Sequence, residues 1–277
     1  MKPFGFWFTK QHAALQFTFI LIFTSGTATP AQTTRDATAT HAGTHSDPER
    51  LTIPARTILP VILNQGLSTK NSHVGQAISG RLAQAVPLPN DGKLKAGAKV
   101  RGTILSVSTV SKNGDAEISF RFTEIEFHHG TLRIVAHLRA LASFMEVQYA
   151  QIPEASPGFG TPYRWVTTEQ IGGDVKYGVD GPVTDNSGET VGRGTAEGVL
   201  VRVTKSPGAA CRGDFEDRDR LQALWVFSSD ACGVYGMPGL KILHAGRTEP
   251  LGEIVLSSET GGVNVRAGAG LLLRLIE

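Results

Sequence analysis

Alternating apolar and polar residues in the middle of the chain predict a β-hairpin. Residues 117–122 alternate polar and apolar side chains, the period-two pattern of a strand with one buried face. The apolar positions shift by one residue after Thr123, and an extra residue there predicts a β-bulge. We expect residues 128–130 to form the turn and residues 132–138 to return with their apolar side chains inward.

The returning strand carries three basic side chains on its other face. Arg133, His137 and Arg139 alternate with the apolar residues. This pattern predicts a basic stripe on a face that water covers.

The second half of the chain also carries the patterns of β-strands. Val199, Val201 and Val203 alternate with other residues, and Leu221–Phe227 is apolar at nearly every position, which is typical of a strand covered on both sides. Leucines recur at alternate positions in 271–275. Residues 167–171 fit either a short helix or no regular element. The predicted fold class is mostly β with little helix, as two small antiparallel barrel-like or sandwich-like blocks.

Composition shifts divide the 277 residues into five segments. The segments are a signal peptide (1–31), a disordered leader (32–50), a barrel-like domain (51–150), a linker rich in Pro and Gly (151–162) and a second β domain (163–277).

The first segment predicts export. Lys2 and Lys10 precede a largely apolar stretch over residues 13–23, and small residues follow. Cleavage after Ala28 or after Ala31 fits equally well, and an uncleaved signal anchor is the alternative. We therefore expect a periplasmic or extracellular protein with no transmembrane span in the mature chain.

Net charge limits the classes of partner. The formal charge is +2, and removal of Lys2 and Lys10 leaves equal numbers of basic and acidic residues. A neutral chain offers no broad electrostatic attraction to nucleic acid, so we expect no nucleic-acid partner.

Cys211 and Cys232 are the two cysteines of the chain. In an oxidising compartment such a pair predicts a disulfide, which would stabilise the fold by about 3 kcal/mol. The spacing lacks a CxxC partner, so a metal site is not expected.

Three segments between Leu51 and Val107 carry a family resemblance. They read LTIPARTILPVILNQGLST, VGQAISGRLAQAV and LKAGAKVRGTILSV. Over roughly residues 51–140 the chain resembles the β-barrel module of TrbI-like conjugal transfer proteins, part of the outer-membrane core of type IV secretion systems. Arg56 stands where the family's first corner has Gly. The resemblance implies an envelope β-barrel module and does not imply a conjugation pore. A small-residue turn precedes an apolar strand in 53–58, 94–100 and 265–270, which independently suggests barrel corners.

No pattern in the chain predicts catalysis. A nucleophile elbow G-x-S-x-G is absent from the sequence, and Glu124 with Glu126 fits a solvated strand face better than a catalytic pair. His128 and His129 are adjacent, so in an extended chain their side chains diverge and a hairpin turn is favoured over a metal site. We expect no catalytic, cofactor-binding or metal-binding residues.

The aromatic residues give the best indication of a binding site. Trp225 and Phe227 fit a core, whereas Tyr163 and Trp165 follow the linker and are candidates to line a groove between the two blocks. The preferred hypothesis is an exported, non-enzymatic envelope protein that contacts another envelope protein or a cell-wall component. The alternative is a secreted hydrolase or carbohydrate-binding protein with its site at this groove.

Overall fold

A computed structural model of the chain describes residues 52–89, 91–109, 115–127, 130–154, 166–204, 220–259 and 261–276. The predicted signal peptide and leader lie outside these residues. No helix in the described part of the chain has the length and apolar character needed to cross a membrane.

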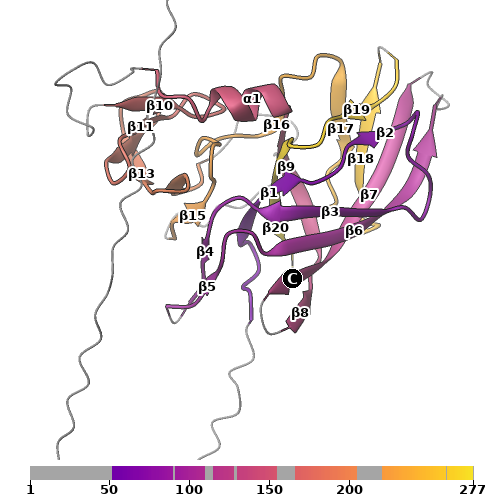
Figure 1. Cartoon of the computed structure of the whole chain (residues 1–277), viewed down its shortest axis with the longest axis horizontal. Helices are drawn as coiled ribbons and strands as arrows, with labels where there is room; N and C mark the ends of the chain where they lie inside the picture. The colour runs from indigo at the N-terminus through magenta and orange to yellow at the C-terminus, as the bar shows by residue number, and fades with distance from the viewer. Residues whose placement is uncertain are drawn as a thin grey trace, which may run out of the picture. The chain divides into compact units, whose positions relative to one another are not determined.

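Ten strands among the described residues form one large sheet (Figure 1). Their order is β16-β9-β20-β1-β3-β6-β7-β18-β17, with β8 paired to β7. All neighbours are antiparallel except β16 and β9. The strands are β1 (Ile58–Leu63), β3 (Ala77–Leu82), β6 (Lys99–Ser108), β7 (Ala116–Phe127), β8 (Gly130–Arg133), β9 (Ala136–Ala142), β16 (Gly233–Tyr235), β17 (Leu240–His244), β18 (Ile254–Ser258) and β20 (Gly270–Leu275).

The two ends of this sheet approach each other, so that it is a nearly closed barrel. The Leu138 N–H in β9 donates to the carbonyl oxygen of Ala245, which follows β17, at 2.9 Å. Apolar side chains fill the interior. They include Leu59, Val61, Ile78, Leu82, Val100, Ile104, Ile118, Phe120, Phe122, Ile254, Leu256, Leu271 and Leu273. The barrel is therefore held by a packed core.

The predicted hairpin and its bulge are confirmed, but the returning strand is shorter than expected, because β8 ends at Arg133 and residues 136–142 form β9, which pairs with β20 and β16. β7 pairs with β8 antiparallel from Glu124 opposite Arg133 to the end of β7. Against β6, Phe122 lies opposite Gly102 and Glu124 opposite Arg101, which leaves Thr123 as the extra residue. The turn residues 128 and 129 lie outside the described residues.

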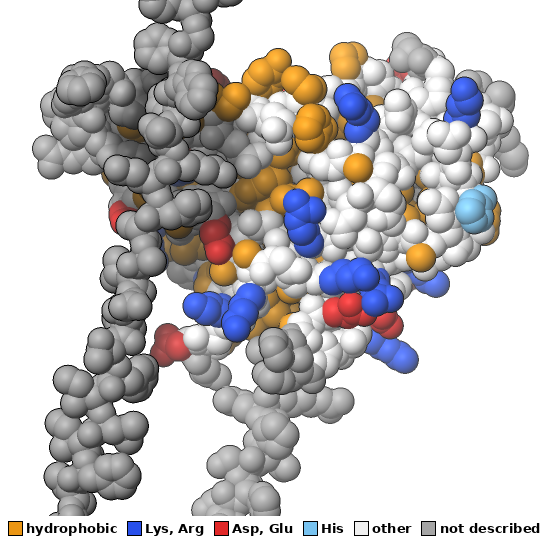
Figure 2. All heavy atoms as spheres, viewed as in Figure 1, with side chains coloured by type: hydrophobic (Ala, Val, Ile, Leu, Met, Phe, Trp, Pro, Cys, Tyr) orange, Lys and Arg blue, Asp and Glu red, His pale blue; other side chains and the backbone are white. Residues whose placement is uncertain are grey.

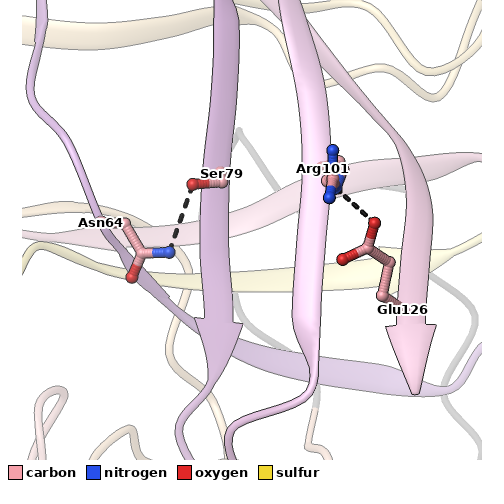
Figure 3. Close-up of polar contacts among 4 residues, drawn as sticks. All are labelled: Asn64, Ser79, Arg101 and Glu126. Carbon is pink, nitrogen blue, oxygen red and sulfur yellow. Dashed lines mark hydrogen bonds and ion pairs between the residues drawn. The ribbon is translucent and has the colours of Figure 1, made fainter. Parts of the chain in front are cut away.

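Polar side chains lie on the outer face of the barrel, on β6 and β7 and also on β3 and the residue after β1. Glu126 Oε1 in β7 forms an ion pair with Arg101 Nε in β6 at 2.5 Å, and Asn64 Nδ2 donates to Ser79 Oγ at 3.2 Å (Figure 3). Figure 2 shows acidic and basic side chains side by side on this surface. Glu124 and Glu126 thus belong to a solvated face, as expected.

The predicted corners are confirmed as one recurring turn. In each, a residue with positive φ donates its N–H to a carbonyl of an adjacent segment, at 2.8–3.0 Å, just before a strand begins. The residue after it donates back across the turn, as in a type II turn. The positive-φ residues are Arg56 before β1, Gly75 before β3, Gly97 before β6, Gly252 before β18 and Gly268 before β20.

Arg56 is strained at its corner, and Arg56→Gly should stabilise the fold. Its φ is 67°, a conformation that glycine adopts without the clash of a Cβ atom. The side chain is exposed, so little packing is lost. We expect a gain of about 0.5–1 kcal/mol in the free energy of unfolding, measured by urea denaturation.

The matched control is Gly97→Ala, because a Cβ there would meet no atom within 4 Å and only the backbone cost remains. The free energy of unfolding of Gly97→Ala should be about 1 kcal/mol lower than that of the natural chain. A loss of stability in Arg56→Gly, or no loss in Gly97→Ala, would contradict this explanation of the corners.

A second sheet of six strands follows the chain order β10-β11-β12-β13-β14-β15, each antiparallel to the next. Two short antiparallel pairs, β2 with β19 and β4 with β5, complete the described strands. The bounds are β10 (Thr167–Glu169), β11 (Val175–Tyr177), β12 (Pro182–Thr184), β13 (Thr190–Gly194), β14 (Val199–Val201), β15 (Gln222–Ala223), β2 (Leu67–Ser68), β19 (Asn264–Val265), β4 (Val86–Pro87) and β5 (Lys93–Leu94). The mostly β fold class is confirmed.

The expected boundary between the blocks differs from the structure. β16, β17, β18 and β20 were expected in a second domain over 163–277, yet they complete the barrel that begins at β1. The second sheet is instead an insertion between β9 and β16, and residues 51–277 form one unit. Alternating patterns predict strands but carry no information about which distant strand completes a sheet.

The second sheet and the outer face of the barrel share a core. Ile58, Ala140 and Leu272 point out of the barrel and pack with residues of the inserted block. These include Val183, Val191, Val199, Val201, Leu224 and Phe227. The insertion explains why β9 and β20 are buried along their whole length.

Gln84 joins the blocks by hydrogen bonds. Its Nε2 donates to the Val199 carbonyl oxygen at 3.0 Å, and its Oε1 accepts from the Trp225 N–H at 2.7 Å. Gln84 is 2% exposed, so these bonds form away from water and fix the two blocks against each other.

The prediction that His137 and Arg139 face water is wrong. Both side chains are buried, with His137 6% and Arg139 1% exposed, and residues of the inserted block cover Arg139. Arg139 Nε donates to the Ala231 carbonyl oxygen at 3.0 Å, and its Nη2 donates to that of Thr204 at 3.3 Å. Arg133 is exposed, as expected.

Two local predictions need correction. Leu221–Phe227 is not one strand, because β15 ends at Ala223 and Trp225 has φ 56° in a turn. The core positions of Trp225 and Phe227 are nevertheless confirmed, at 5% and 0% exposure. Residues 167–171, for which a short helix was considered, begin with strand β10.

Asp174 gives the inserted block a pH-dependent stability. Its Oδ2 accepts from the Ser229 N–H at 2.6 Å, and burial raises the pKa of its carboxyl, an effect that this hydrogen bond only partly opposes. In the unfolded chain the Asp174 carboxyl has its ordinary pKa of 3.8. Above this pH it has lost its proton in most unfolded chains but keeps it in more of the native ones. Stability therefore falls as pH rises through the raised pKa.

We expect Asp174→Asn to abolish this fall and to be more stable than the natural chain at neutral pH, in urea denaturation from about pH 4 to pH 7. Asp180→Asn, an exposed neighbour, should keep the pH dependence. An unchanged pH dependence in Asp174→Asn would contradict the assignment.

Candidate functional site

The helix α1 (Phe144–Tyr149) begins with Ser143 as its N-cap residue. Ser143 Oγ accepts from the Glu146 N–H at 3.2 Å, in the sequence Ser-Phe-Met-Glu. Val147 anchors the helix, since it is 2% exposed and belongs to the core shared with the inserted block. Residues on the opposite side of α1 therefore face outward.

Three large apolar side chains are exposed along this segment. Met145 is 45% exposed, Tyr149 62% and Ile152 61%. Figure 2 shows apolar side chains gathered at the top of the molecule, where Figure 1 places α1. An exposed apolar cluster of this kind marks an interaction site more often than an isolated apolar residue does.

A hollow of about 330 Å³ lies beside this cluster, and we call it the α1 hollow. It is built from α1 and the residues after it, from the end of β10 and from β16. Its lining is Glu146, Tyr149, Ala150, Ile152, Glu154, Glu169, Gln170, Ile171, Gly172 and Tyr235. Segments far apart in the sequence thus meet at one place.

The lining is acidic. Three of the described lining side chains are carboxylates, Glu146, Glu154 and Glu169, and among the residues that the structure describes the lining includes no Lys, Arg or His. Gly236, with φ 67°, allows the carboxylate of Glu146 to approach β16, because a Cβ at this position would lie 2.9 Å from Glu146 Oε1.

Gln170 is a lining residue whose side-chain oxygen is buried. Its side chain is 3% exposed, and its Nε2 donates to the Thr168 carbonyl oxygen at 3.3 Å. Its Oε1 has no hydrogen-bond partner among the described residues.

Tyr235 contributes a fixed hydroxyl. Its Oη accepts from the Cys232 N–H at 2.9 Å. Burial raises the pKa of this hydroxyl, and the Cys232 hydrogen bond opposes the effect. The hydroxyl is therefore protonated at neutral pH and retains a hydrogen to donate.

The predicted groove residues Tyr163 and Trp165 lie outside the described residues, as does Cys211. Cys232 is described and lies next to the hollow through Tyr235, but its pairing with Cys211 stays a prediction. The residues that flank the predicted groove, Glu154 and Val166, are described, and Glu154 lines the α1 hollow.

The described residues hold no arrangement that indicates catalysis. No group of three or more His, Cys, Asp or Glu side chains in them is placed to hold a metal ion. Ser228 Oγ donates to Asp230 Oδ1 at 2.8 Å, but Ser228 is fully buried and does not face solvent.

A larger hollow of about 460 Å³ lies between the β4–β5 pair and the residues around Glu197. There the Ala85 N–H donates to Glu197 Oε2 at 2.6 Å, which joins the barrel to the inserted block. Its lining carries both signs of charge, Asp91 and Glu197 with Lys93, and none of the large exposed apolar residues. The α1 hollow is therefore the stronger candidate.

The sequence contained one signal for this site. The N-cap sequence at Ser143 followed by apolar Met145 and Tyr149, four residues apart, is typical of a short helix with an exposed apolar stripe. Glu169 and Gln170 carried no such signal. Comparison with protein-family models, curated proteins and solved structures found no significant match to this chain.

Proposed function

We propose that this chain is a non-enzymatic binding module that contacts another polypeptide through the α1 hollow and the apolar cluster beside it. The observation that carries the proposal is the exposure of Tyr149 and Ile152 in the lining of an acidic hollow, together with the exposed Met145 on the same helix. Tyrosine and apolar side chains that stay exposed on a rigid support are typical of protein contact sites. Val147 and the Ser143 cap provide that support.

The proposed setting is the cell envelope. The features of residues 1–31 favour export to the periplasm or the outside, where Cys211 and Cys232 would form a disulfide. The resemblance of residues 51–140 to TrbI-like modules supports an envelope protein or a cell-wall component as the partner.

A photo-crosslinking experiment tests this function. Benzoylphenylalanine replaces Tyr149 in the full chain produced in its host, and as a matched control it replaces Leu243, which is 54% exposed on β17 outside the hollow. We expect a discrete adduct from position 149 alone, with the partner segment identified by mass spectrometry.

A synthetic peptide of that segment should bind the natural chain in calorimetry. Tyr149→Ala should weaken it about tenfold or more, and Leu243→Ala should leave it unchanged. No adduct from position 149, or equal adducts from both positions, would contradict the proposed function.

A second candidate is carbohydrate binding at the same hollow. Tyr149 and Tyr235 line it together with carboxylates, a combination that also suits sugars. Saturable binding of a glycan that Tyr149→Ala abolishes, without any polypeptide adduct, would favour this candidate.

A further inference from the structure

A group of cations lies on the outer face of the barrel. In β3, β6, β7 and β8, residues of higher exposure alternate with residues of the core, so the more exposed side chains point out of the barrel. Five of these outward residues are exposed Lys or Arg, and we call them the basic face: Arg81, Lys99, Arg101, Arg121 and Arg133. They are not part of the lining of the α1 hollow, so this is a separate surface.

The strand register gathers these side chains on one surface. Arg81 lies directly opposite Lys99, and Glu124 lies between Arg101 and Arg133 on the neighbouring strands. Residues paired in this way have their Cβ atoms roughly 5 Å apart on the same face of the sheet. The cations are therefore spread in two dimensions, across four strands and along them, and do not form a single line.

The carboxylates beside these cations neutralise them only in part. Glu124 and Glu126 lie among them, and both are half-buried whereas the cations are exposed. Arg101 Nε pairs with Glu126 Oε1 (Figure 3), and no other member of the basic face forms an ion pair with a described residue. Five cations against two carboxylates leave an excess of three positive charges. The loop before β18, next to β7, carries charges of both signs, namely Arg247, Glu249 and Glu253.

Two further observations indicate that the basic face takes an anionic ligand. Like charges directly opposite each other destabilise a sheet, and Arg81 with Lys99 is such a pair, which an anion between them would stabilise. Arg81 is also held by neutral groups, because its Nη1 donates to Asn64 Oδ1 at 3.1 Å and Asn64 Nδ2 donates to Ser79 Oγ at 3.2 Å (Figure 3). These hydrogen bonds orient the guanidinium and leave its charge unneutralised.

We propose that the basic face binds the phosphate groups of an anionic phospholipid surface. Four of its five cations are arginines, whose guanidinium groups bind phosphate oxygens bidentately. Cations spread in two dimensions match the headgroups of a bilayer better than they match a linear polyanion. The large exposed apolar residues of the described chain all lie outside these four strands, so the contact is electrostatic and does not involve insertion.

Vesicle sedimentation tests the inference on the chain purified from its host. The vesicles contain phosphatidylcholine alone, or phosphatidylcholine with about one third phosphatidylglycerol. We expect saturable binding to the anionic vesicles only, because the neutral ones offer no net charge. The affinity should fall at least tenfold as the salt concentration rises from about 0.05 to 0.5 M.

The double variant Arg121→Gln/Arg133→Gln should weaken binding to the anionic vesicles about tenfold or more. Both side chains are exposed and form no ion pair with a described residue, so the fold should be unaffected. The matched control is Arg193→Gln/Arg202→Gln, which removes the same charge from two exposed positions of the inserted block and should bind as the natural chain does. Near-UV circular dichroism shows that each variant is folded.

No binding to the anionic vesicles, equal binding to both kinds of vesicle, or equal losses in the two double variants would overturn the lipid assignment. Dextran sulfate, a linear polyanion, is the second probe. If it binds through the basic face and the vesicles do not, the partner is a polymer and the assignment is wrong. The adducts from position 149 report on the α1 hollow alone, so this inference and the proposed function succeed or fail separately.

Discussion

Arg139→Ala should destabilise the chain by about 3–5 kcal/mol, the largest effect that we expect from a single truncation. Arg139 is among the largest fully buried side chains. Its truncation removes charge-assisted hydrogen bonds to the Ala231 and Thr204 carbonyl oxygens and leaves a cavity between barrel and inserted block. Differential scanning calorimetry should record a fall in Tm of roughly 10 °C.

The matched control is Arg133→Ala, which removes the same side chain from an exposed position in β8. It should change stability by less than about 0.5 kcal/mol. Equal effects of the two substitutions would mean that Arg139 does not attach the inserted block to the barrel.

Gly102→Ala should lower the free energy of unfolding by about 3 kcal/mol. The new Cβ would lie 2.0 Å from the carbonyl oxygen of Arg121 in the neighbouring strand, which is far too close. The obstacle is backbone, so no side chain can rotate away, and β6 and β7 must separate beside the bulge at Thr123. Urea denaturation gives the free energy of unfolding.

Gly130→Ala provides the comparison within the same hairpin. A Cβ there would be no closer than 3.8 Å to the nearest atom, which belongs to Phe127. This variant should be within about 0.5 kcal/mol of the natural chain. A Gly102→Ala variant of equal stability would show that β6 and β7 are not paired as described.

The barrel strands could largely be predicted from the sequence because most of them face water on one side. The alternation in β7, its slip at Thr123 and the return through β8 were all visible. The corner before β1 was visible as well, although Arg56 occupies the place of glycine.

The environment of β9 could not be predicted, since it depends on a block inserted later in the chain. His137 and Arg139 have the spacing of a solvated face, yet both are buried, and Arg139 donates to the carbonyl oxygens of Thr204 and Ala231. A local pattern records which face a residue takes but not what covers that face.

The α1 hollow was even harder to predict from the sequence than the environment of β9. The carboxylates of Glu146 and Glu169 come from segments that become neighbours only when the inserted block folds against α1. The N-cap residue Ser143 was the one local signal.

The central claim is that the surface around α1 is where this chain makes contact. Hydrogen–deuterium exchange of the full chain, alone and with the purified partner identified by crosslinking, tests it directly. We expect slower exchange over residues 144–152 and 169–172 in the complex. Protection confined to other exposed apolar positions, such as those around Val74 or Leu251, with unchanged exchange around α1, would contradict it.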